Sequence, residues 1–106
     1  MADNDSNIAP GQTKTFIYVG QFIPNQVNIQ NLSQTSQANY TVKSGPRPWT
    51  YYGLVPPGKT QAIQVHWPTG VAVFANVGGG AINVYGDGLR PAAPGEEEKY
   101  GTQAGV

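Results

Sequence analysis

The sequence has no cysteine and very few charged side chains, and each shortage excludes a class of protein. Without cysteine, neither a disulfide nor a thiolate-bound metal can form. Lys and Arg number six, Asp and Glu number six, and together they make up 11% of the 106 residues, against roughly 25% in an ordinary globular domain. Such a chain has no basic stripe that would hold nucleic acid or an anionic membrane. We expect neither partner.

Long apolar runs and helical periodicity are also missing. No apolar stretch approaches the ~20 residues that a membrane-spanning helix needs, so we expect no insertion into a membrane. Nine prolines and fourteen glycines interrupt every window in which apolar residues would recur with the i, i+3, i+4 spacing of an amphipathic helix. The chain has the length of one domain with a single modest core.

Short alternating segments with the residue types of β-strands fill most of the chain instead. Turn signals rich in Gly and Pro separate them at intervals of about 8–12 residues, which is typical of a sandwich or barrel. We expect strands at residues 12–19, 27–32, 38–42, 49–54, 61–67, 71–77 and 81–85. The pattern predicts an all-β fold, a small antiparallel β-sandwich of the jelly-roll or Greek-key type.

The segment 71–77 is almost wholly apolar, which predicts a central strand covered on both faces. Gly78–Gly80 follow it and can take the positive φ angles of a tight hairpin. We therefore expect residues 81–85 to run back beside this strand, with Asn83 and Tyr85 facing outward.

The sandwich is expected to occupy residues 10–88 as a single domain. Residues 1–9 are polar, with little to bury, and predict a loose N-terminal arm. Residues 89–106 contain two prolines and the acidic run Glu96–Glu98, and cannot bury enough apolar surface to order themselves. They predict a solvated C-terminal tail, or one that lies along the domain or a neighbour if it is ordered.

Two similar turns indicate an internal repeat. The tetrapeptide PGQT at residues 10–13 recurs as PGKT at 57–60, and each opens a strand. In both halves the next strand ends in an asparagine followed by an aliphatic residue, at Asn31 and at Asn76. We predict two units related by a pseudo-twofold axis, at residues 10–42 and 57–85.

Residues 53–60, GLVPPGKT, match the phosphate-binding-loop pattern letter for letter. That loop needs backbone N–H groups that point at phosphate, between a strand and the N-terminus of a helix. Pro56 and Pro57 remove two of those N–H groups, and the residues after Thr60 alternate like a strand. The repeat explains the same letters as a turn, so we expect no nucleotide to bind.

Groups suited to catalysis or metal binding are scarce. His66 is the only histidine, and a metal site normally needs three or four ligands. Asp87 is the only acidic residue near the expected core, so a pair of catalytic carboxylates would need a residue from the tail. We expect a protein that is not an enzyme, with no catalytic residue, no metal and no cofactor.

The aromatic residues give the most specific indication of a binding site. Rings that flank loops can stack on the C–H faces of a sugar, while amide and imidazole groups bind its hydroxyls. The expected ligand contacts are Trp49, Tyr52, His66 and Trp67. Asn28, Asn76 and Asn83 would contribute amide groups if they face outward. Burial in the core is the alternative for the Trp and Tyr rings.

The abundance of Asn, Gln, Ser and Thr indicates a surface of neutral hydrogen-bonding groups, which suits a sugar or another copy of the chain. The sequence therefore predicts a non-catalytic carbohydrate-binding protein, a small lectin-like sandwich. The alternative is a structural component of a viral particle or cell-surface appendage that acts through self-association as a homo-oligomer. The low charge and the long tail fit both.

Overall fold

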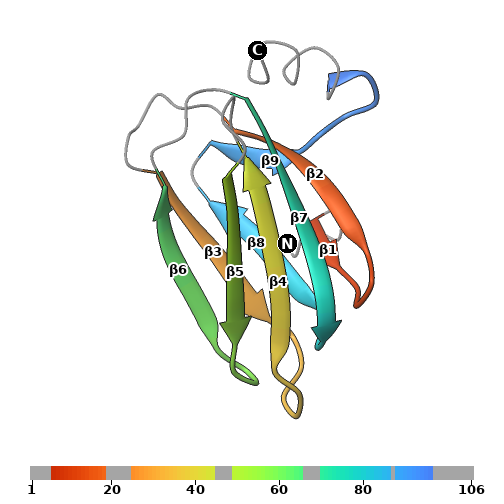
Figure 1. The fold of residues 1–106 in the computed structure, drawn as a ribbon, viewed down its shortest axis with the longest axis vertical. Helices are drawn as coiled ribbons and strands as arrows, with labels where there is room; N and C mark the ends of the chain where they lie inside the picture. Colours follow the sequence, from red (N-terminus) through yellow and green to blue (C-terminus); the bar gives the residue numbers. More distant parts are fainter. Residues whose placement is uncertain (1–5, 19–24, 45–48, 66–69, 87, 97–106) are drawn as a thin grey trace.

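The computed structural model describes residues 6–18, 25–44, 49–65, 70–86 and 88–96, which form two antiparallel β-sheets packed face to face (Figure 1). The strands in these ranges are β1 (Asn7–Ile8), β2 (Thr13–Tyr18), β3 (Asn25–Asn31), β4 (Ala38–Ser44), β5 (Trp49–Val55), β6 (Thr60–Val65), β7 (Gly70–Gly79), β8 (Ile82–Gly86) and β9 (Leu89–Pro91). Sheet A has the strand order β1-β8-β3-β6, and sheet B has the order β5-β4-β7-β2-β9. This confirms the predicted all-β sandwich.

Each strand expected from the sequence is present over the part of it that the structure describes, and two further strands lie outside the expected domain. β1 falls in the predicted arm and pairs with β8, and β9 falls in the predicted tail and pairs with β2. The sheets therefore extend beyond residues 10–88 at both ends. The remaining parts of the arm and tail, residues 1–5 and 97–106, lie outside the described residues.

The strand pairing is that of a jelly roll, in which a long antiparallel hairpin rolls up into two sheets. β1 pairs with β8, β2 with β7, β3 with β6 and β4 with β5, so that each pair is nested inside the one before. β8 also pairs with β3, and β7 pairs with β4, which joins the nested pairs side by side. Each sheet then has one face toward the common core and one toward the outside.

The glycine run at the end of β7, Gly78–Gly80, does not form the predicted hairpin. β7 lies in sheet B and β8 in sheet A, so Gly78–Gly80 carry the chain from one sheet to the other. Gly79 has a φ of 90°, and a Cβ on it would lie 1.8 Å from the Gln37 carbonyl oxygen. A hairpin and a crossing between sheets use the same glycine conformations, so the turn residues alone did not distinguish them. The position of β7 at the centre of sheet B agrees with its apolar sequence.

The core lies between the two sheets. In β8, Ile82 and Val84 are buried while Tyr85 is exposed, as a strand with one inward face requires. Phe16 of β2 and Phe74 of β7 meet edge to face, with ring centroids 5.3 Å apart. Because side chains alternate between the two faces of a strand, every second residue lies on the outer face of its sheet and is not required to be apolar.

Asn31, at the end of β3, holds a turn in place through its buried side chain. Its Nδ2 donates to the carbonyl oxygens of Ser36 at 2.7 Å, Val55 at 3.1 Å and Pro56 at 3.2 Å. Its Oδ1 accepts a hydrogen bond from the Ser33 backbone N–H at 2.9 Å. One side chain therefore fastens the loop that leaves β3 to the turn that opens β6.

Asn76 of β7 makes the corresponding set of bonds in the other half of the chain. Its Nδ2 donates to the carbonyl oxygens of Ile8 at 3.0 Å and Gly80 at 2.9 Å, and its Oδ1 accepts from the Gly78 backbone N–H at 3.0 Å. Asn76 is buried. The expectation that it offers an amide to a ligand is therefore wrong, because the backbone uses that amide.

The two halves also correspond in their turns. Inside the first turn the Gln12 N–H donates to Ala9 O at 2.9 Å, and inside the second the Lys59 N–H donates to Pro56 O at 3.1 Å. The Asn76 N–H then donates to Gln12 O in the first half, as the Asn31 N–H donates to Lys59 O in the second, both at 2.9 Å. The two sheets also have matching strand orders. Each strand of sheet A, in the order β1-β8-β3-β6, corresponds to the strand four places away in the chain, which gives the order β5-β4-β7-β2 of sheet B without β9. Any jelly roll has this second correspondence, because its nested pairs are symmetrical. The repeat units 10–42 and 57–85 stay a prediction, with the matched hydrogen bonds in support.

The GLVPPGKT segment lies in a strand, a turn and the start of another strand. β5 ends at Val55, Gly58 takes a φ of 69° in the turn, and β6 begins at Thr60. The Lys59 N–H donates to Pro56 O, inside the turn, at 3.1 Å. A helix N-terminus is what gives the phosphate loop its anion-binding groups, and here a strand takes that place.

Replacing either buried asparagine should destabilise the fold. Asn31→Ala and Asn76→Ala are each expected to lower the free energy of unfolding by about 2–3 kcal/mol, because buried carbonyl groups lose their donor. Urea unfolding measures this change. Gln37→Ala is the control, since Gln37 is exposed in the loop after β3, and it should change stability by less than about 0.5 kcal/mol. Losses no larger than the control's would contradict the role given to the two amides.

The strand that follows the turn also predicts the response to nucleotide. We expect ATP with Mg²⁺ to leave the melting temperature unchanged in a thermal-shift experiment. A ligand present at a hundred times its dissociation constant stabilises a folded protein by about 2.7 kcal/mol, which raises the melting temperature by several degrees. A rise of that size that disappears in Lys59→Ala would show that the turn binds phosphate.

Candidate functional site

Among the four predicted ligand contacts, Tyr52 is the one whose side chain the structure describes. Tyr52 faces away from the core on β5, and 75% of it is exposed. Trp49 is the first residue of β5, but its side chain, like all of His66 and Trp67, lies outside the described residues. β5 begins and β6 ends at the same end of the sandwich (Figure 1). That the four residues form one site stays a prediction.

A second candidate surface covers the outer face of sheet A. Cross-strand pairing places Asn7, Asn83, Gln30 and Thr60 in one row, Tyr85, Asn28 and Ala62 in the next, and Gln26 beside Gln64 in a third. We call these nine residues the amide face. Six of them carry a carboxamide, and none is charged. The predicted outward orientation of Asn28, Asn83 and Tyr85 agrees with this arrangement.

The amide face follows from the period of its strands. β3 (NQVNIQN), β6 (TQAIQV) and β8 (INVYG) alternate between core residues and outward residues, most of which are amides. Asn is depleted in strands, because its side chain competes for backbone hydrogen bonds. Strand propensity therefore does not account for Asn28 and Asn83 at these positions.

A hollow of about 440 Å³ lies on the amide face, lined by Gln26, Asn28, Tyr85 and Gly86. Its size is within the range of small-ligand sites, which is about 300–1,000 Å³. Gln26 Nε2 donates to Asn28 Oδ1 at 3.0 Å, and Asn28 Nδ2 lies 3.5 Å from the Tyr85 carbonyl oxygen. These contacts orient the Asn28 amide. The Tyr85 side chain is 44% exposed and forms the aromatic part of the hollow.

Gly86 determines how closely β8 approaches β3 at this hollow. A Cβ at Gly86 would lie 2.4 Å from the Gln26 carbonyl oxygen and 3.2 Å from the Val27 Cα. Any larger residue would have to push the two strands apart. The glycine therefore keeps Tyr85 beside Asn28 and leaves that part of the hollow without a side chain.

Asn83 lies in the neighbouring row, where its Oδ1 is buried and has no hydrogen-bond partner among the described residues. A buried amide oxygen without a donor costs about 1–3 kcal/mol. Fold stability alone does not favour this residue at its position. It belongs with the amides that strand propensity leaves unexplained.

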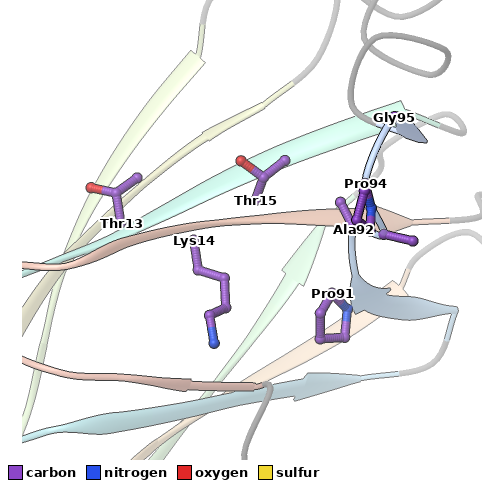
Figure 2. A pocket seen from close by; sticks show the side chains of 8 residues that line it. Thr13, Lys14, Thr15, Pro91, Ala92, Pro94 and Gly95 are labelled. Carbon is purple, nitrogen blue, oxygen red and sulfur yellow. The ribbon is translucent and has the colours of Figure 1, made fainter.

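A larger groove, of about 700 Å³, lies between β2 and the segment after β9 (Figure 2). Thr13 and Thr15 lie on one side of β2, while Lys14 points to the other side, where its Nζ donates to the Asn7 carbonyl oxygen at 3.1 Å. The opposite wall, residues 91–95, consists of Pro, Ala and Gly. This groove lacks the amide groups and the aromatic ring of the hollow at Tyr85, and we regard it as the weaker candidate.

The segment after β9 is closed by its own contacts. Arg90 forms an ion pair with Glu96, and Glu96 Oε1 also accepts a hydrogen bond from the Ala93 N–H at 2.8 Å. Part of the predicted tail is therefore folded back on itself next to β2. For residues 89–96 this agrees with the alternative stated for the tail, that an ordered tail lies along the domain.

No group of three or more His, Cys, Asp or Glu side chains in the part of the chain that the structure describes could hold a metal ion. Within the same residues, no helix is long and apolar enough to cross a membrane.

Sequence reasoning identified the orientation of the amide face but not its importance. It named Asn28 and Asn83 as outward amides, yet it placed the site at the aromatic residues near loops. One feature of the sequence could have indicated this surface: no outward position of β3, β6 or β8 carries a charged residue. Only the strand order shows that these strands are neighbours, with β8 and β6 on either side of β3.

Comparisons with known proteins do not assign this site. No family model matches the chain, and neither a curated protein nor a solved structure matches it.

Proposed function

We propose that the protein binds carbohydrate without catalysis, and that the glycan occupies the hollow on the amide face. The observation that carries the proposal is the exposed Tyr85 ring beside the Asn28 and Gln26 amides, on a surface without charge. A sugar ring presents C–H groups on one face and hydroxyls around its edge. An aromatic ring next to neutral donors and acceptors complements both.

The chemistry of the hollow also sets the expected affinity. A neutral hydrogen bond contributes about 0.5–1.5 kcal/mol after exchange with water, and an aromatic contact contributes a similar amount. A few such interactions, less the cost of immobilising the sugar, give a dissociation constant of about 1 mM for a single sugar unit. Useful binding then depends on several units or several sites acting together.

The predicted contacts at Trp49, Tyr52, His66 and Trp67 remain a separate hypothesis for the same function. Tyr52 lies on sheet B, and the Tyr85 hollow lies on sheet A. A glycan in the hollow is therefore on the opposite face of the sandwich from Tyr52. Variants at these two tyrosines distinguish the two locations.

A structural role through self-association is the second candidate function. It is favoured by a different observation, the long uncharged edge strands on one side of the sandwich. The two functions are compatible, because an edge strand and the outer face of sheet A are different surfaces.

Binding should depend on Tyr85. Wild-type protein on an array of neutral glycans should bind at least one class, and Tyr85→Ala should weaken that binding about tenfold through loss of the ring contact. Tyr85→Phe keeps the ring and should retain most of the affinity, as measured by titration calorimetry with the glycan found. Tyr52→Ala is the matched control, a second exposed tyrosine, and in the titration with a monovalent glycan it should keep the wild-type affinity per site.

Two results would contradict the proposal in different ways. No binding on the array at high protein concentration would reject carbohydrate recognition altogether. If the affinity per site for a monovalent glycan is lost in Tyr52→Ala and kept in Tyr85→Ala, the site lies at the residues predicted around β5.

A further inference from the structure

The four edges of the two sheets are protected very unequally. β1 and β9 are edge strands on one side, and β5 and β6 are edge strands on the other (Figure 1). β1 has two residues, and β9 has three, one of them Pro91 and one Arg90. Short length, proline and charge are the usual means of preventing an edge from pairing with another chain.

β5 and β6 have none of these protections. β5 has seven residues (WTYYGLV) and β6 has six (TQAIQV), with no proline and no charged residue in either. β5 pairs with β4 in unbroken register from Trp49 to Val55, so no bulge interrupts it. About half of the backbone N–H and C=O groups of such a strand point away from its partner and remain available for pairing.

Apolar side chains accompany this edge. Tyr52 is 75% exposed and Leu54 is 46% exposed, and both face outward from β5. Toward the core, Tyr51 and Ile63 are only partly buried against the main cluster. The side of the sandwich at β5 and β6 thus combines two edge strands with incompletely covered apolar surface.

A hydrogen bond between the two sheets lies beside this edge. Tyr40 of β4 lies over Gly53, where a Cβ would be 2.2 Å from the ring, and its hydroxyl donates to Gln61 Oε1 of β6 at 2.5 Å. Burial raises the pKa of Tyr40, and the neighbouring Tyr51 raises it further, so the hydroxyl keeps its proton for this bond. The bond links the two sheets beside their open edges.

We infer that a second copy of this chain pairs with β5, antiparallel and about a twofold axis, so that the two sheets B become one continuous sheet. A twofold pair places each surface against itself, and β5 suits this because it contains no charge that would meet a like charge. Pairing centred on Tyr52 sets Trp49 opposite Val55 of the second copy. It is the register in which the whole strand overlaps.

The same axis has a consequence for the amide face. A twofold axis that makes β5 pair antiparallel runs perpendicular to the sheets, so it leaves the outward direction of sheet A unchanged. The two amide faces of the dimer then point the same way. If the proposed carbohydrate binding holds, the dimer presents two weak sites to one glycan-bearing surface, and this geometry allows avidity.

The oligomeric state tests the interface without any glycan. Sedimentation velocity on the full chain, over concentrations from micromolar to millimolar, should show a concentration-dependent dimer. Tyr52→Lys puts two like charges next to each other across the interface and should weaken dimerisation at least tenfold. Val77→Lys is the matched control, an exposed apolar residue of sheet B on β7, two strands from the edge, and should dimerise like the wild type.

Cross-linking tests the register. The chain has no cysteine, so Tyr52→Cys introduces one thiol per copy, and directly opposed residues of antiparallel strands are close enough for a disulfide. Mild oxidation should give a covalent dimer with Tyr52→Cys and not with Val77→Cys. A monomer at every concentration, a dimer insensitive to Tyr52→Lys, or equal cross-linking of both cysteine variants would each overturn the inference.

Discussion

The structure depends on satisfying backbone carbonyl groups where the chain crosses from one sheet to the other. Each crossing takes polar backbone past the edge of an apolar core, and an unpaired buried carbonyl is costly. Asn31 and Asn76 meet this requirement with one side chain each, since both bond to a loop that follows them and to a distant segment that precedes a strand. Each therefore joins segments far apart in sequence, Asn31 to Pro56 and Asn76 to Ile8.

The scarcity of charge determines the chemistry of two surfaces of the sandwich. Ordinary domains stay soluble through charged outer faces, whereas here the outer face of sheet A is built of neutral amides with Tyr85 among them. Neutral amides bind water or hydroxyl groups without attracting ions. Because charged residues are scarce, β5 and β6 also lack the lysines that usually prevent an edge strand from pairing with another chain. One compositional feature thus underlies both the proposed glycan site and the proposed dimer.

Much of the fold was predictable, because alternation with period two is a local property. The strands, their inward and outward residues and the apolar character of β7 follow directly from the order of residues. The hairpin expected at Gly78–Gly80 was wrong, since a turn's residues specify its backbone angles and not the sheet that the next strand joins. β1 and β9 were missed for a related reason. Two or three residues carry no periodicity, and only pairing with β8 and β2 makes them strands.

For the candidate site, sequence by itself determined which groups are present and which way many of them face: neutral amides and Tyr85 outward, and aliphatic residues inward. Tertiary structure alone decided which of them are neighbours. It placed Gln26 and Asn28 beside Tyr85 on one surface, turned Asn76 inward to serve the backbone, and exposed Tyr52 on an edge. The physical reason is that residue type and spacing determine local conformation. Which residues become spatial neighbours depends instead on strand pairing between distant parts of the chain, as between Asn28 and Tyr85.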